Sequence, residues 1–187
     1  SDPLTVVSNT DTQTVPASIG IDVAPITDPG TVTAVDVTGA EDADIALGDL
    51  QAELVDQDGS ETLTVVLKGV PTDAVILVDG VPVANNGPDG GSLFGEPTFQ
   101  WSLSQADLAN AVIRPPANFS GDIPLTLEAV TIETGTDDVR TVSQDFTVFV
   151  NPVGDGVEFN GADVSASGQE GDDVTIAVNA KTLEPDY

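Results

Sequence analysis

The sequence predicts an all-β protein whose main part is an antiparallel β-sandwich of about seven strands. Its apolar residues are mostly Val, Ile, Leu and Ala, Thr is plentiful, and aromatic residues make up 4%, a composition typical of strands. Several short segments alternate between apolar and polar residues, which is the periodicity of a strand with one buried face. Clusters rich in Gly, Pro, Asp and Asn separate these segments and indicate frequent turns.

The strand pattern recurs along the chain. The expected strands are residues 43–50, 62–69, 74–79, 98–103, 109–114, 122–134 and 140–150. The alternation is clearest in residues 62–69, where Leu63, Val65 and Leu67 point to one face. Residues 104–109 predict a single helical turn capped by Ser104. The long segment 79–97 is expected to elaborate a hairpin, with residues 81–83 as an edge strand.

The charge of the chain excludes several classes of function. There are 32 acidic and 4 basic residues, no His and no Cys, and the formal net charge is −28. Without His or Cys there is no Ser-His-Asp or Cys-His catalytic machinery, no thiolate or imidazole zinc site and no disulfide. So few cations do not make a nucleic-acid-binding patch, and an anionic membrane surface would repel the chain. Carboxylate pairs serve glycosidases, but nothing marks one pair among these acids, so we expect no enzyme.

The acidity calls for counter-ions, because like charges oppose compaction. Hydrophobic residues make up 40% of the chain, which is enough to build a core. The acids cluster at turns and linkers, which favours specifically bound cations. Adaptation to high salt is the alternative, and it should also load the strand faces with acids.

An internal echo divides the chain. Residues 23–30 reappear as residues 150–156, and the acidic stretch 39–47 reappears as 168–178, at a spacing of about 127 to 129 residues. The sequence therefore predicts a window of a tandem array. Residues 1–29 are the closing strand and linker of a preceding module, 30–155 a complete sandwich, and 156–187 the opening strands of a following module.

Five motifs in this order resemble one family. They are Glu41-Asp42, residues 56–63, Gly69-Val70-Pro71, residues 115–121 and Asn151-Pro152-Val153. This set resembles the cadherin-like, immunoglobulin-type repeats of large bacterial RTX adhesins secreted by type I systems. The resemblance implies calcium-rigidified extracellular modules on the bacterial cell surface. Their partners are the adjacent modules of the same polypeptide, and neighbouring domains reach a glycan or protein on a host or other surface.

The residues themselves also point to Ca²⁺. A hard cation of this kind takes six to eight oxygen ligands, several of them anionic, from loops that can wrap around it. Asp56, Asp58 and Glu61 lie within one short segment, where Gly59 permits a tight turn and Ser60 offers another oxygen. The spacing is not that of an EF-hand loop. We therefore expect a calcium site at an end of the sandwich.

Strand direction predicts which loops meet, because alternate turns of an antiparallel array lie at the same end. One end is expected to bring Asp56, Asp58 and Glu61 to the 115–122 turn and to Asp155 of the outgoing linker. The opposite end is expected to collect Asp28, Glu41, Asp42, Asp137 and Asp138. A cation at either end would neutralise repulsion and fix one module against the next.

Three other features have structural and functional interpretations. Trp101, with Phe99 on the same strand face, is expected to fill the core rather than to stack on a sugar. Arg114 and Arg140 are expected to pair with surface acids. The alternative to a spacer is a ligand-recognition module that binds a sugar or peptide with calcium through residues 79–97. An inserted ligand-binding domain beside this scaffold is a further possibility.

Overall fold

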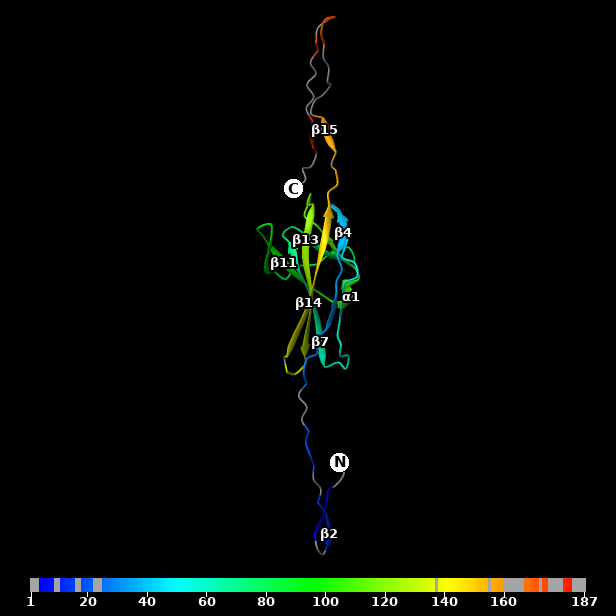
Figure 1. Ribbon diagram of the computed structural model, residues 1–187, viewed down its shortest axis with the longest axis vertical. Helices are drawn as coiled ribbons and strands as arrows, with labels where there is room; N and C mark the ends of the chain where they lie inside the picture. The colour runs from blue at the N-terminus through cyan, green and yellow to red at the C-terminus, as the bar shows by residue number, and fades with distance from the viewer. Residues whose placement is uncertain are drawn as a thin grey trace.

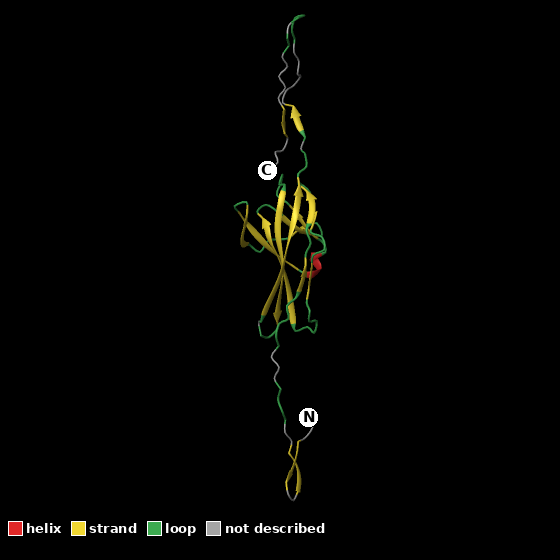
Figure 2. Ribbon diagram, in the orientation of Figure 1, coloured by secondary structure: helices red, strands yellow, loops and turns green. Residues whose placement is uncertain are grey.

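Figure 1 shows the computed structural model of the chain, in which residues 4–8, 11–15, 18–21, 25–136, 138–154, 156–159, 167–171, 173–174 and 180–182 are described. They form strands and one short helix, which confirms the predicted all-β class (Figure 2). The elements are β1 (Leu4–Ser8), β2 (Asp11–Val15), β3 (Thr31–Thr33), β4 (Val37–Ala40), β5 (Ile45–Ala46), β6 (Gln51–Glu53), β7 (Glu61–Pro71), β8 (Val75–Val78), β9 (Val81–Pro82), β10 (Pro88–Leu93), β11 (Glu96–Leu103), α1 (Gln105–Leu108), β12 (Ala111–Arg114), β13 (Gly121–Glu133), β14 (Val139–Asn151), β15 (Val157–Phe159) and β16 (Ala180–Thr182). Among the described residues, no helix is long and apolar enough to cross a membrane.

Two sheets enclose the core. The larger has the strand order β10-β11-β7-β13-β14-β4, and the smaller has the order β5-β12-β8-β9. Neighbouring strands in both sheets are antiparallel, except that β4 runs parallel to β14. Apolar side chains from both sheets belong to one buried cluster. This arrangement is consistent with the predicted β-sandwich.

The core follows the predicted alternation. Val65 and Leu67 of β7 are 1% and 0% exposed, and Ile123 and Leu125 of β13 are 0% and 1% exposed. Burial of each such side chain contributes about 1.5 to 3 kcal/mol, so these central strands supply much of the folding free energy. Trp101 is also buried, and its indole Nε1 donates to the Val83 carbonyl at 2.8 Å. Its expected role in the core is confirmed, and it offers no platform for a sugar.

The single helical turn also forms as predicted. Ser104 is the N-cap of α1, and its hydroxyl accepts a hydrogen bond from the Asp107 amide. The Asp107 carboxylate in turn accepts the Ser104 amide at 3.0 Å, which completes a capping box. Leu108 is buried, so the turn is fixed to the core.

Several strands, β4 and β10 among them, occupy segments that the pattern assigned to linker or loop. β4 pairs with β14 from Val37↔Val148 to Ala40↔Asn151, and β10 pairs with β11. Both have weak strand sequences, with Gly39 in β4 and Gly90 and Gly91 in β10. Gly39 is required by close packing, because a Cβ there would lie 2.4 Å from Cγ1 of Ile45. The segments that hold β4 and β10 each carry the chain across the sandwich once more than predicted, which changes the end at which neighbouring loops lie.

Short strand pairs also flank the central sheets along the chain (Figure 1). β15 pairs antiparallel with β16, from Val157↔Thr182 to Phe159↔Ala180. β3 and β6 pair in the same way, from Thr31↔Glu53 to Thr33↔Gln51. Both pairs are therefore antiparallel, and each joins three residues of one strand to three residues of the other.

Candidate functional site

Two buried glutamates face each other where β7 begins and β13 ends. Glu61 is 7% exposed, Glu133 is 2% exposed, and the two residues are partners across the strands. Burial raises the pKa of Glu133, and the negative charges of Glu61 and Asp58 raise it further. The three ion pairs of the described residues involve neither glutamate. Among the described residues, no ion pair therefore neutralises either acid.

The incoming linker, residues 25–30, is held against this pair. The Asp28 amide donates to Oε1 of Glu61. The Thr27 amide donates to Oδ2 of Asp138 at 3.3 Å, and the Thr27 hydroxyl donates to the Asp138 carbonyl at 2.7 Å. The linker is thus fixed both to the start of β7 and to the β13–β14 turn. We call this region, with the loop before β7, the proximal end.

The loop before β7 brings two more carboxylates to the proximal end. Oδ1 of Asp56 accepts the Asp58 amide at 2.9 Å, and Oδ1 of Asp58 accepts the Ser60 amide at 2.7 Å. Gly59 has a φ of +90°, which few other residues adopt, and it allows these successive turns. Hydrogen bonds from the Ser60 side chain and backbone lower the pKa of Asp58, so this carboxylate is ionised at neutral pH.

A similar arrangement forms at the opposite, distal end. Glu41 is 4% exposed, and its amide donates to the Asn151 carbonyl at 2.9 Å. Oε1 of Glu41 accepts the Val153 amide of the outgoing linker. The Asn118 amide donates to Oδ1 of Asp42 at 2.9 Å, which joins the loop before β13 to the same group.

Each end holds buried side-chain oxygens with no hydrogen-bond partner among the described residues. They are Oε2 of Glu61 at the proximal end, and Oε2 of Glu41 with Oδ1 of Asn118 at the distal end. In both glutamates the other carboxylate oxygen accepts a linker amide, which fixes the orientation of the side chain. A buried acceptor left without a partner is unfavourable, most of all when it carries charge. Anionic and amide oxygens of this kind are the ligands that Ca²⁺ prefers.

The structure groups the predicted ligands differently from the sequence prediction. Asp56, Asp58 and Glu61 lie with the incoming linker, not with the outgoing one, because Glu61 pairs directly with Glu133 at the end of β13. The physical reason is one more chain reversal than predicted between β8 and β11, through β9 and β10. As a result β11 and β13 both run antiparallel to β7, and the 115–122 turn lies at the distal end beside Asp42.

The prediction for the opposite group is also wrong in part. Glu41 and Asp42 lie beside the outgoing linker, while Asp28 and Asp138 lie at the proximal end. The added strand β4 carries the chain from one end to the other between Asp28 and Glu41. Two predicted ligands, Asp137 and Asp155, lie outside the described residues.

Two residues of the ends were not among the predicted ligands, which were all acids of turns and linkers. Glu133 continues the inward-facing positions of β13, two residues beyond the buried Thr131. An acid at a core position of a strand is itself a signal, because such burial needs a partner. Asn118 has a φ of +55°, a conformation that Asn tolerates better than most residues.

The carboxylates of the described residues do not by themselves make a complete metal site. No group of three or more His, Cys, Asp or Glu residues within the described part of the chain is arranged to hold a metal ion. An ion at either end therefore needs backbone or amide oxygens as well as carboxylates. Asp138 is partly neutralised, since its Oδ2 lies 3.5 Å from Nη2 of Arg140. Arg114 forms two bonds to Asp44, at 2.6 and 2.8 Å, so both arginines pair with surface acids as predicted.

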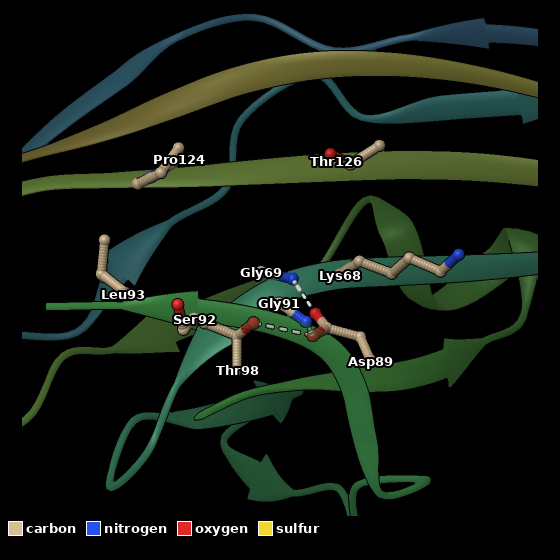
Figure 3. A pocket seen from close by; sticks show the side chains of 9 residues that line it. All are labelled: Lys68, Gly69, Asp89, Gly91, Ser92, Leu93, Thr98, Pro124 and Thr126. Atoms are coloured by element: carbon tan, nitrogen blue, oxygen red, sulfur yellow. Dashed lines mark hydrogen bonds between the residues drawn. The ribbon is translucent and has the colours of Figure 1, made fainter. Parts of the chain in front are cut away.

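A separate hollow of about 280 Å³ lies between the β10–β11 hairpin and β13, and Asp89 forms part of its wall (Figure 3). This carboxylate accepts hydrogen bonds from the Gly69 amide, the Gly91 amide and the Thr98 hydroxyl, each at 2.7 Å. Burial acts to raise the pKa of Asp89, but these bonds together lower it. Both carboxylate oxygens are therefore engaged, and Asp89 holds the hairpin to β7 rather than facing a ligand.

Comparison with known proteins identifies no relative. No protein-family model matches this chain, and neither a curated protein nor a solved structure shows significant similarity to it.

Proposed function

We propose that this chain is a calcium-binding structural module of an extracellular adhesin on a bacterial cell surface. Ca²⁺ would act as the ligand that folds and stiffens the junctions between successive modules. The adhesin context is supported by the sequence resemblance alone. The calcium is supported independently, by the geometry of the two ends.

The observation that carries the proposal is the arrangement shared by Glu41 at the distal end and Glu61 at the proximal end. Each uses one carboxylate oxygen to hold a linker amide and leaves the other buried and unpartnered. A solvated surface acid would not be buried in this way. A cation at each free oxygen would remove the cost of burying the charge. It would also tie the linker to the sandwich, because the same carboxylate contacts both.

The tandem arrangement would complete each site. In the internal echo, Pro152 and Asp155 recur at the positions of Pro25 and Asp28, so the outgoing linker of one module is the incoming linker of the next. Glu41 binds that linker through the Val153 amide. The counterpart of Glu61 in the next module would bind it two residues further on. One short linker then lies between two buried glutamates, and calcium there would restrict the angle between modules.

We further propose that the sandwich is of the immunoglobulin or cadherin-like type and that its neighbours share the fold. The register of β15–β16 repeats that of β3–β6, which supports residues 156–187 as the opening strands of a following module. Residues 1–29 would be the closing strand and linker of a preceding one. The direct partners are then these adjacent modules, and the role is structural rather than catalytic.

Thermal unfolding in CaCl₂, MgCl₂ and EDTA at matched ionic strength tests the proposal. Extracellular sites bind Ca²⁺ with dissociation constants of about 10⁻⁴ to 10⁻³ M, so millimolar Ca²⁺ is the relevant range. We expect a calcium-specific rise in melting temperature, and small-angle scattering should show a stiffer and more extended particle. An equal response to Mg²⁺ would mean that the acids attract cations only diffusely.

Matched variants locate the effect. Glu41→Gln and Glu61→Gln should each remove part of the calcium response, because each removes one anionic ligand at one end. Asp145→Asn is the control, since Asp145 is an exposed acid within β14 whose carboxylate accepts only the Thr126 hydroxyl among the described residues. If the control variant loses as much as the other two, general charge and not a site accounts for the response.

A further inference from the structure

An exposed phenylalanine occupies the tip of the β10–β11 hairpin. Phe94 and Gly95 form the two-residue turn between the partners Leu93 and Glu96, with φ values of +52° and +89°. Such turns favour Asn or Asp before Gly, because a bulky side chain is strained at positive φ. Phe94 is nevertheless 77% exposed, so packing within the described chain does not explain why an aromatic residue stands there.

Phe94 forms one wall of a hollow of about 190 Å³ where three connections of the chain meet. Its ring centroid lies 6.0 Å from that of Phe119, with the two rings tilted by 48°. Pro71 and Pro116 add further apolar surface. The hollow thus presents aromatic and aliphatic surface that a ligand side chain can cover.

The charged residues that line this hollow are both acidic. They are Asp73 and Glu96, and both are exposed. The three ion pairs of the described residues use other acids, namely Glu128, Asp44 and Asp138. With a net charge of −28, the chain repels anions and repels a second copy of itself. The complementary ligand is a cation that also carries apolar surface.

We propose that this hollow binds an arginine side chain from a basic segment of a protein partner. The aliphatic stem packs against Phe94 and Phe119, and the guanidinium stacks on the exposed ring, an arrangement that favours arginine over lysine. Asp73 and Glu96 accept its N–H groups. The hollow shares no residue with the glutamate sites at the two ends. It therefore adds a recognition surface to a module proposed above as structural, although Phe119 directly follows Asn118 of the distal end.

The test is an NMR titration of the ¹⁵N-labelled full chain, in Ca²⁺, with the peptide Ac-Leu-Arg-Leu-NH₂. The neutral analogue with citrulline in place of arginine is the matched ligand control. We expect the largest amide shifts at Asp73, Phe94, Gly95 and Phe119, and at least tenfold weaker binding of the citrulline peptide. Shifts spread evenly over the acidic surface would overturn the proposal. Equal binding of both peptides would also overturn it. In a parallel titration with methyl glucoside, selective binding at this hollow would assign the hollow to a sugar and overturn the proposal as well.

Variants separate binding from folding. Phe94→Asn places a residue that suits the turn at this position, so it should raise the melting temperature slightly and weaken peptide binding at least tenfold. Phe149→Ala, which removes a partly exposed aromatic from β14, should leave binding unchanged. Asp73→Asn with Glu96→Gln should abolish the preference for arginine over citrulline. If Phe94→Asn binds as tightly as the unaltered chain, the proposal is wrong.

Discussion

Replacement of Glu61 by Gln should have opposite effects on stability with and without calcium. Gln retains the oxygen that accepts the Asp28 amide, so the linker contact survives. The substitution removes the charge of the buried, unpartnered Oε2. It also removes one of the charges that raise the pKa of Glu133. In EDTA the variant should therefore be at least as stable as the unaltered chain.

In calcium the same substitution should be destabilising. A single site occupied at about 100 times its dissociation constant adds about 2.7 kcal/mol to the free energy of unfolding. For a chain of this size, 1 kcal/mol shifts the melting temperature by about 2 to 4 °C. Loss of the proximal site should then lower the melting temperature in calcium by roughly 5 to 11 °C.

The assay is differential scanning calorimetry of both proteins in EDTA and in about 10 mM CaCl₂, a concentration about 100 times a dissociation constant of about 10⁻⁴ M. Two melting temperatures per protein give the calcium response directly. The reasoning is refuted if Glu61→Gln lowers the melting temperature equally in both solutions. That result would assign Glu61 a purely structural role, such as holding the linker.

Three further predictions concern residues away from that oxygen. Because the folded-state pKa of Glu133 lies above its ordinary value of 4.5, the folded chain binds this proton more tightly than the unfolded chain. The free energy of unfolding in EDTA, measured by urea unfolding, should therefore rise as pH falls from 7 toward 4.5. Glu133→Gln should flatten this dependence on pH. An unchanged dependence would contradict the raised pKa of Glu133. Gly69→Ala should cost about 2 kcal/mol or more, since φ is +88° and the new Cβ would lie 2.5 Å from the Pro124 carbonyl oxygen. Gly80→Ala, at a φ of +76° with nothing within 4 Å, should cost less, and equal losses would show that backbone strain alone matters. Ser104→Ala should cost about 1 kcal/mol by loss of the helix cap, and no change in the urea midpoint would argue against the capping box.

The parts of the fold that the sequence predicted are those where local pattern and tertiary burial agree. The long strands β7 and β13 alternate over many residues, so both strands were predicted, and Val65 and Leu67 were placed on the buried face correctly. β10 was missed because Asp89, Gly90 and Gly91 have little strand propensity of their own. That strand depends on tertiary contacts instead, chiefly the hydrogen bonds that the Asp89 carboxylate accepts from Gly69 of β7 and Thr98 of β11.

The candidate sites show the same division. The loop of Asp56 and Asp58 was recognisable because acids, Gly and Ser are close together in sequence. Which linker those acids face depends on the number of strand reversals, so the two unexpected strands made the grouping wrong. Glu133 was predictable from the inward positions of its strand, but the predicted ligands were only acids of turns and linkers.

The most direct test of the central claim is an anomalous difference map from crystals grown in Ca²⁺. The account predicts ions within about 2.3 to 2.6 Å of Oε2 of both Glu41 and Glu61, with Asn118 Oδ1 as a further distal ligand. Water or another side chain at those oxygens, with no ion at either end in millimolar Ca²⁺, would contradict it.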